Sequence, residues 1–304
     1  MKDSKLKNKD FDNITIVVLV VLILFFLAVV FISRTQPLQT SDTPLASNQP
    51  SIKNYIFTAN TGTGVEENQY YLASSLNEFC LENYCQSVFI AGNALGKHIA
   101  VSAIDPEFIK RFQDPYRDFE APFYIALGDN DKIQCLDCYI SFSDISSIWK
   151  FESNYYEVKE PGISFYVLDT NTIDQEQINW LATRLAVNSS KKNVVVGHAD
   201  IINSNNADIN ELKELICRQA DMFVSGQLLA LAKYRDINDC NAVFVNSGMG
   251  SSTQGITIDS IEGNSDFDFF SDEPGYIVLR SIDGSNFEIS FYSQANNILF
   301  QTTI

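Results

Sequence analysis

Three short apolar stretches of this chain end in a glycine followed by a polar residue, and this repeated ending limits the possible folds more than any other feature. They cover residues 88–93, 123–129 and 193–198, and they end in Gly-Asn, Gly-Asp and Gly-His. Apolar runs of this length next to glycine predict buried strands. Because ligands bind beyond the carboxyl ends of strands in layered α/β proteins, we expect the three polar endings to share one site.

Predicted strands and helices alternate along most of the chain. Leu72, Leu76 and Phe79 keep helical spacing within 66–84, and Thr172-Ile-Asp-Gln175 has the pattern of a capping box that starts a helix. The chain closes with strands near 276–279, 287–292 and 298–301. This order predicts one α/β domain, a sandwich of mixed sheets. We also expect a hairpin over 155–168, a helix over 105–119, a looser region over 133–151 and a solvated acidic-aromatic loop over 266–273.

The N-terminal part predicts a membrane anchor. Residues 14–32 are apolar apart from Thr15, and about 19 helical residues span roughly 28 Å, close to the hydrocarbon thickness of a bilayer. Four lysines precede this segment, which places the N-terminus in the cytoplasm and the rest outside it. A cleaved signal peptide is the alternative, but no small-residue cleavage site directly follows Ile32. We therefore expect a single-pass protein: a cytoplasmic tail (1–13), a transmembrane helix (14–33), a flexible stalk (34–52) and an extracytoplasmic domain (53–304).

The charge of the chain excludes one class of partner. The formal net charge is −17, and residues 1–13 carry four lysines and three aspartates, so the remainder carries −18. An acidic domain of this kind repels nucleic acid, and no basic patch offsets the repulsion. The expected contacts are therefore the membrane, through the N-terminal helix, and a protein or small-ligand partner that the sequence does not identify.

Six cysteines follow the anchor, and an even number outside the cytosol favours disulfides. Close spacing makes Cys80–Cys85 and Cys135–Cys138 plausible pairs and leaves Cys217 with Cys240. Cys135-Leu-Asp-Cys138 also fits a redox or metal pair. A redox pair opens a helix after a strand, whereas this one is expected to follow a loop, and a second Cys-x-x-Cys for zinc is missing. We therefore favour a structural bridge.

From about Tyr55 to the C-terminus, the order of motifs resembles that of the tartrate-resistant (purple) acid phosphatases of the calcineurin-like metallophosphoesterase superfamily. The resemblance includes the segments 111–118, 165–170 and 194–198 and the closing strands. It implies an α/β/β/α sandwich of two mixed sheets and a phosphatase activity. It also implies a dinuclear Fe, Zn or Mn centre built from five motifs.

The first two of these motifs are altered here. The resemblance places Asn60 where the first motif has a metal-binding aspartate. It places Asn93 where the second motif has another aspartate, and Gly96 where that motif has an iron-binding tyrosine. Two carboxylates and one phenolate are therefore replaced by two neutral amides and a residue without a side chain.

The remaining motifs are altered as well. Asp129 stands in place of the third motif's bridging asparagine, and Asn130 in place of its substrate-contacting histidine. His198 keeps the histidine of the fourth motif, whereas Gln227 and Leu229 replace both histidines of the fifth. His198 and Asp129 are then the two remaining candidate ligands, although His198 also fits a hydrogen-bonded histidine at a strand end.

Two adjacent cations need carboxylates, a phenolate and imidazoles to offset their charge, and even a single zinc site uses at least three protein ligands. The sequence therefore predicts that no metal cofactor is held in this way. A single Ca²⁺ or Mg²⁺ remains possible, bound by Asp129, Asp131 and the amide oxygens of Asn60 and Asn93. The other histidine, His98, lies in a predicted loop and is expected to be exposed.

These observations favour a pseudophosphatase, a membrane-anchored domain that binds through a former active-site crevice or serves as a component of an envelope complex. The alternative is a divergent phosphomonoesterase with a residual or mononuclear metal site.

Overall fold

The computed structural model describes residues 22–24, 52–64, 66–131, 135–188, 191–252, 255, 266–282 and 286–304. The chain divides into two compact units, Met1–Gln49 and Pro50–Ile304. Within the described ranges, no helix is both long enough and apolar enough to cross a bilayer. The predicted anchor, 14–33, lies outside those ranges except for residues 22–24. The predicted tail and all but residue 52 of the predicted stalk also lie outside them.

The described part of the second unit contains two mixed seven-stranded sheets. The first sheet has the order β14-β13-β12-β1-β2-β3-β4, with β1 to β4 parallel and β12 to β14 antiparallel. Its strands are β1 (Lys53–Thr58), β2 (Cys85–Ala91), β3 (Phe123–Ala126), β4 (Trp149–Lys150), β12 (Gly275–Ser281), β13 (Phe287–Ser293) and β14 (Ile298–Thr303). The expected closing meander is therefore present.

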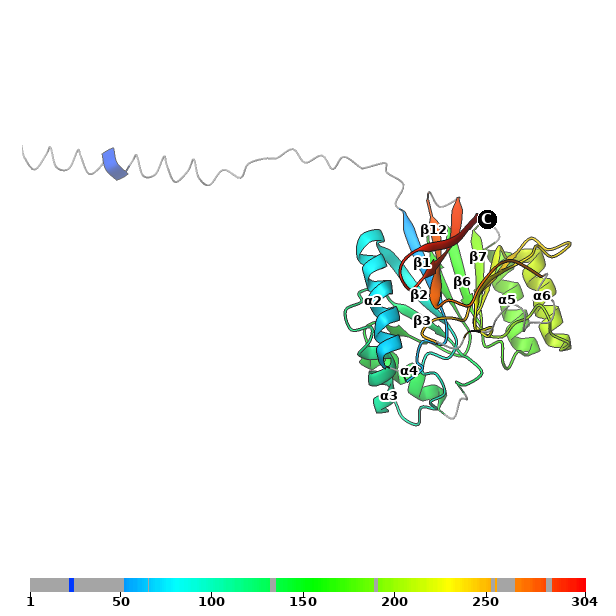
Figure 1. The fold of residues 1–304 in the computed structure, drawn as a ribbon, viewed down its shortest axis with the longest axis horizontal. Helices are drawn as coiled ribbons and strands as arrows, with labels where there is room; N and C mark the ends of the chain where they lie inside the picture. Colours follow the sequence, from blue (N-terminus) through cyan, green and yellow to red (C-terminus); the bar gives the residue numbers. More distant parts are fainter. Residues whose placement is uncertain are drawn as a thin grey trace, which may run out of the picture. The chain divides into compact units, whose positions relative to one another are not determined.

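The second sheet has the order β11-β9-β10-β8-β7-β6-β5, with a parallel centre and antiparallel edges. Its strands are β5 (Tyr156–Glu160), β6 (Ile163–Val167), β7 (Lys192–Val196), β8 (Met222–Ser225), β9 (Leu231–Tyr234), β10 (Val243–Ser247) and β11 (Phe267–Ser271). Figure 1 shows α2 (Glu66–Asn83), α3 (Pro106–Phe108) and α4 (Leu136–Ile145) beside β1 to β3, and α5 (Gln175–Val187) and α6 (Ala207–Gln219) on the opposite side. The predicted α/β architecture of two mixed sheets with flanking helices is confirmed.

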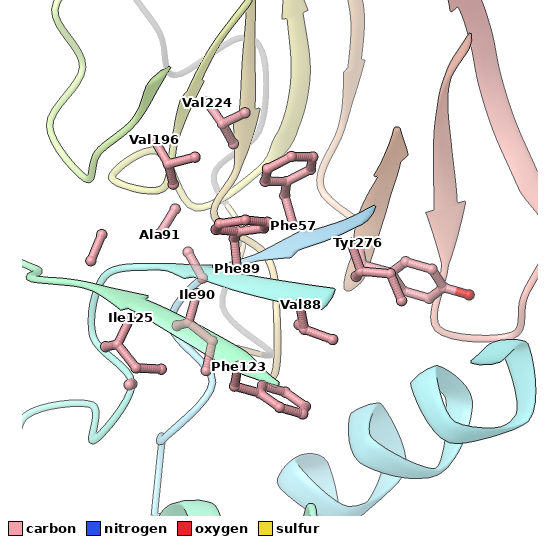
Figure 2. Packing of buried hydrophobic residues seen from close by; sticks show 14 of the residues in the cluster. Phe57, Val88, Phe89, Ile90, Ala91, Phe123, Ile125, Val196, Val224 and Tyr276 are labelled. Carbon is pink, nitrogen blue, oxygen red and sulfur yellow. The ribbon is translucent and has the colours of Figure 1, made fainter. Parts of the chain in front are cut away.

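Aromatic side chains hold the two sheets together. The ring of Phe165 on β6 lies 4.5 Å from that of Phe89 on β2 and 4.8 Å from that of Tyr55 on β1. Figure 2 shows Phe89 turned towards Val196 of the second sheet and Val88 on the opposite face of β2. Both faces of the central strands are therefore buried, which explains why the strand sequences are continuous apolar runs.

Two helices differ from the sequence prediction, one in its capping residue and the other in its length. Asp174, not Thr172, caps α5, because its carboxylate accepts the Gln177 N–H at 2.9 Å while the Thr172 hydroxyl donates to Asp169. The helix expected over 105–119 is also shorter. Asp105 caps α3, which passes at once into the π-helical turn η1 (Ile109–Gln113).

Two regions expected to be irregular are ordered elements. The region 133–151 contains α4, whose Phe142 stacks on Phe108 at 4.3 Å, so tertiary packing stabilises a helix that periodicity did not reveal. Because α4 follows Cys135 directly, the Cys-x-x-Cys does open a helix. The acidic-aromatic segment 266–273 contains the edge strand β11. There Phe269 stacks on Phe300 at 5.0 Å, and Asp268 pairs with the buried Lys233 at 2.6 Å.

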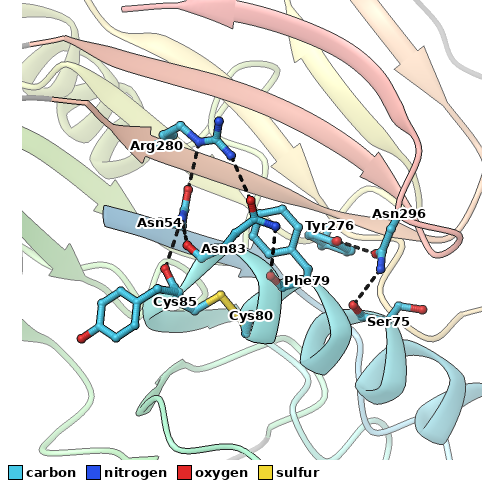
Figure 3. Close-up of a disulfide and its surroundings, with 10 residues drawn as sticks. Asn54, Ser75, Phe79, Cys80, Asn83, Cys85, Tyr276, Arg280 and Asn296 are labelled. Atoms are coloured by element: carbon cyan, nitrogen blue, oxygen red, sulfur yellow. Dashed lines mark hydrogen bonds between the residues drawn. A yellow bond between two sulfur atoms is a disulfide. The ribbon is translucent and has the colours of Figure 1, made fainter. Parts of the chain in front are cut away.

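The structure forms all three expected disulfides, Cys80–Cys85, Cys135–Cys138 and Cys217–Cys240. The first closes the end of α2 against β2, where Asn54 and Arg280 add hydrogen bonds (Figure 3). The third joins the end of α6 to the segment before β10.

We expect the double variant Cys217→Ser/Cys240→Ser to lose about 3 kcal/mol of unfolding free energy, because a longer closed loop restricts the unfolded chain more. The sequence separation is 23 residues here and 5 in Cys80–Cys85. Cys80→Ser/Cys85→Ser should therefore lose only about 2 kcal/mol. Calorimetric unfolding of both variants measures the difference, and a larger loss for the shorter loop would contradict it.

Candidate functional site

A cavity of about 480 Å³ lies at the carboxyl ends of strands from both sheets. All eight positions that the resemblance singled out line it: Asn60, Asn93, Gly96, Asp129, Asn130, His198, Gln227 and Leu229. The three strand endings expected to converge therefore do so, two of them from the first sheet (β2 and β3) and one from the second (β7).

The close approach of the two sheets explains one of the strand-ending glycines. Gly92 has a φ of +96°, and a Cβ atom there would lie 2.2 Å from Nδ1 of His198. Any other residue would strain the backbone and displace the imidazole. A glycine at the end of β2 is thus required for His198 to enter from the facing sheet.

The side-chain amide of Asn93 connects neighbouring residues of the site by hydrogen bonds. Its Nδ2 donates to Oδ1 of Asn60 at 2.8 Å and to Oδ1 of Asp129 at 2.9 Å. Its Oδ1 accepts the backbone N–H of Asn130 at 3.0 Å, which fixes the orientation of the amide. An NH₂ group therefore points at the oxygen atoms that would otherwise be directed at a cation.

Asn60 ties the tip of β1 to the second sheet. It adopts φ 55°, a left-handed conformation that asparagine tolerates better than most residues. Its Nδ2 donates to the carbonyl oxygens of Gly226 and Gly248, both at 2.8 Å. A carboxylate at this position has no hydrogen to donate, so the amide is the group that these contacts require.

His198 is buried and faces an oxygen acceptor at each ring nitrogen. Nδ1 lies 2.8 Å from the carbonyl oxygen of Ala91, and Nε2 lies 3.0 Å from Oδ1 of Asp129. The carbonyl oxygen can only accept, so Nδ1 carries a hydrogen. The hydrogen bond from His198 lowers the pKa of Asp129 well below its usual range, against the effect of partial burial, and Asn93 adds to the lowering.

Asp131, which the sequence suggested as a cation ligand, instead accepts hydrogen bonds that hold the loop after β3. One of its oxygens accepts the backbone N–H groups of Gly128 at 2.7 Å and Asn93 at 2.8 Å, and the other accepts the hydroxyl of Tyr139 at 3.0 Å. Burial raises the pKa of Asp131, although these three donors oppose the rise. Asp131 does not line the cavity.

Gly96 occupies a position where no side chain fits. Its φ is +62°, and a Cβ atom there would lie 2.0 Å from the carbonyl oxygen of Gly62. Arg111 fixes this arrangement, since its Nη1 donates to the carbonyl oxygens of Gly62 at 2.7 Å and Leu95 at 3.2 Å. The backbone has therefore closed around the place where the resemblance expects a tyrosine.

The loop after β8 carries two of the altered positions, Gln227 and Leu229. Oε1 of Gln227 accepts the backbone N–H of Asp200 at 2.8 Å, and Leu229 packs against the main core. A residue that we did not single out, Asn246 at the end of β10, holds this loop. Its Nδ2 donates to the carbonyl oxygens of Leu228 at 2.7 Å and Ala230 at 2.6 Å.

The signal for Asn246 was present in the sequence, because it too is a polar residue at the end of an apolar strand. Five further residues line the cavity and carry no recognisable sequence pattern: Thr63, Asn68, Lys97, Ser251 and Ser252.

His98 does not contribute to the cavity. It is partly buried rather than exposed, and its Nε2 lies 3.0 Å from Oδ2 of Asp105. Burial raises the pKa of Asp105, but hydrogen bonds from His98 and from two backbone N–H groups outweigh it and lower the pKa overall. The pair stabilises the turn before α3.

No protein-family model matches the chain. Among curated proteins, it is 27% identical to tartrate-resistant acid phosphatase type 5 of Oryctolagus cuniculus over 93 residues, which cover 26% of this chain and 29% of that protein. It is 24% identical to the Mus musculus protein over 141 residues, which cover 36% and 43%. The matches therefore span less than half the length of these curated relatives.

Solved structures extend the similarity to most of the described fold. GAP50, described as the anchor in the inner membrane complex of Plasmodium, aligns with a TM-score of 0.71 at 18% identity and covers 83% of this chain and 88% of that one. Purple acid phosphatase PPD1 from Lupinus luteus seeds aligns with a TM-score of 0.64 at 14% identity, over 84% and 54%. This chain has the purple acid phosphatase fold. A dimetal phosphatase from Danio rerio aligns more distantly, with a TM-score of 0.54 at 9% identity over 83% and 98%.

The residues at the eight positions that the resemblance singled out do not fit a dinuclear metal centre. Among the residues that the structure describes, no group of three or more histidine, cysteine, aspartate or glutamate side chains could hold a metal ion. The oxygen atoms of Asn60 and Asp129 accept hydrogen bonds from Asn93, and the aspartate also faces His198. A metal would have to replace these bonds and displace an NH₂ group.

We expect Asn93→Asp, which introduces the residue that the resemblance implies here, to destabilise the chain. It removes two donated hydrogen bonds and places a second carboxylate beside Asp129, a loss of about 3 kcal/mol. Thermal unfolding at neutral pH measures the loss, with the exposed Asn205→Asp as the control of equal charge. Equal stability of the two variants would contradict the assigned role of the Asn93 amide.

We also expect Asp129 to make stability depend on acid. Its pKa is lower in the folded chain. Its contribution is therefore complete above the ordinary aspartate pKa of about 3.9 and is lost as the pH falls towards the folded value. Since the carboxylate is half exposed, we expect only about 1 kcal/mol. The unfolding midpoints of wild type and Asp129→Asn should differ at pH 6 and converge as the pH falls below 4. A difference between the two midpoints that does not change with pH would refute this. The variant Asp272→Asn, at an exposed position, is the control.

Proposed function

We propose that this chain is a membrane-anchored pseudophosphatase: its domain keeps the purple acid phosphatase fold and uses the former active-site cavity for binding rather than catalysis. The observation that carries the proposal is the Asn93 amide, whose NH₂ group donates to the two neighbouring oxygen ligand candidates. A hydrolase of this type needs a metal-activated hydroxide and cations that clamp the phosphoryl oxygens. The cavity offers amides and hydroxyls for these tasks, with a single carboxylate and one imidazole.

The lining of the cavity indicates the kind of ligand it accepts. Amide and hydroxyl groups predominate, and the two charged groups at the surface, Asp129 and Lys97, have opposite signs. Neutral amides and hydroxyls donate and accept hydrogen bonds without favouring either charge. The cavity therefore suits a small polar ligand, or a polar loop of a partner protein, better than a phosphate ester.

Similarity to GAP50 supports an anchoring role, since that protein is described as an anchor in a membrane complex. In our proposal, residues 14–33 span the membrane with the N-terminus in the cytoplasm. The domain from residue 53 onwards then lies on the other side and binds its partner there.

The direct test is metal-dependent turnover by the full chain purified in detergent. We expect no hydrolysis of p-nitrophenyl phosphate above the protein-free rate with added Fe, Zn, Mn or Mg. Elemental analysis after dialysis should find well below one metal ion per chain, because two candidate donors are too few for a stable site.

The comparison of two variants makes the result decisive. Turnover that disappears in His198→Ala but persists in Arg218→Ala, a change at an exposed position on α6, would establish the alternative, a divergent phosphomonoesterase. Turnover that persists equally in both variants would point to a contaminating enzyme and leave the proposal standing.

A further inference from the structure

A second hollow lies at the carboxyl end of α2, apart from the cavity described above, since the two share no lining residue. This groove has a volume of about 190 Å³. Its apolar part is formed by the Cys80–Cys85 disulfide, Leu81, Tyr84 and Phe119, and its acidic part by Asp118 and Glu120.

The backbone at the groove is held in a strained conformation. Tyr84 has a φ of 51°, a left-handed conformation that costs a bulky residue on the order of 1–3 kcal/mol. Three contacts maintain it. The Cys80–Cys85 disulfide (Figure 3) spans it, its N–H donates to the Cys80 carbonyl oxygen at 2.9 Å, and its carbonyl oxygen accepts from Asn54 at 3.1 Å. The backbone position of this tyrosine is therefore set in advance of any contact.

Large apolar side chains are exposed at this rigid point. Leu81 is 79% exposed and Tyr84 is 66% exposed, whereas Phe119, which also lines the groove, is buried. Single exposed apolar residues are common on soluble proteins and need no explanation. Two of them beside a concave surface, held by a disulfide and a strained turn, form a preorganised contact surface.

The acidic side of the groove has carboxylates that are available for a partner. Asp118 and Glu120 are exposed, and neither forms an ion pair within the described part of the chain. An apolar floor beside two carboxylates matches the two parts of a basic side chain. The aliphatic stem packs on the floor, and the charged head reaches the carboxylates or the face of the Tyr84 ring.

We propose that this groove is the docking site for a lysine or arginine side chain in a basic segment of a partner protein. Charge complementarity selects this occupant. A second copy of the chain would bring another net charge of −17, and nucleic acid or an anionic lipid surface would be repelled as well. The site is independent of the cavity, so it does not depend on the loss of catalysis.

The test measures binding of a fluorescein-labelled twelve-residue peptide, with two arginines flanked by leucines, to the full chain in detergent by fluorescence anisotropy. A matched peptide has glutamate in place of both arginines. We expect only the basic peptide to bind, and Asp118→Asn/Glu120→Gln to weaken it about tenfold through loss of two exposed charge contacts. Leu81→Ser should weaken it as well, because the stem loses its apolar contact.

The control Asp272→Asn/Glu273→Gln removes the same charge from another exposed segment, and Asn130→Ala changes the cavity. Both should bind the basic peptide as the wild type does. Equal weakening by the two charge variants would overturn the proposal, since it would show only general attraction to an acidic protein. Absence of binding, binding of the glutamate peptide, or loss of binding in Asn130→Ala would overturn it too.

Discussion

The hydrogen bonds donated by the Asn93 amide determine what this site can be. A metal centre needs oxygen and nitrogen atoms whose lone pairs converge on one point, and in this chain an NH₂ group is placed at that convergence. The amide satisfies Asn60 and Asp129 without a cation, so the site is complete as folded. Asn60 in turn donates hydrogen bonds to the carbonyl oxygens of Gly226 and Gly248, which joins the tip of β1 to the second sheet.

The change extends beyond ligand identity to the backbone. Gly96 leaves no room for a Cβ atom, and Arg111 joins the loop that carries Gly96 to the loop after β1. Restoring the family's ligands one at a time would therefore meet both a charge penalty at Asn93 and a steric penalty at Gly96. The core residues Phe89 and Phe165 do not line the cavity, whereas Leu229 both lines it and packs against the core.

The sequence was sufficient for most of the strands, for the disulfides and for the convergence of the polar strand endings. Local patterns and close spacings gave all of these except Cys217–Cys240, which was the pair that remained. The sequence was insufficient where contacts between distant residues determine whether an element forms. The helix α4 is stabilised by contacts of Phe142 with Phe108, and β11 by the pairing of Asp268 with Lys233, neither of which has a local signal. Likewise the Asp131 carboxylate resembled a cation ligand until its backbone partners were known.

Anomalous X-ray diffraction from crystals soaked in Zn²⁺ or Mn²⁺, recorded at the metal's absorption edge, tests the central claim most directly. We expect no anomalous peak among Asn60, Asn93, Asp129 and His198, and an Asn93 amide still within hydrogen-bonding distance of its two oxygen partners. Two peaks a few ångströms apart at these strand ends, with the Asn93 amide turned away, would contradict it.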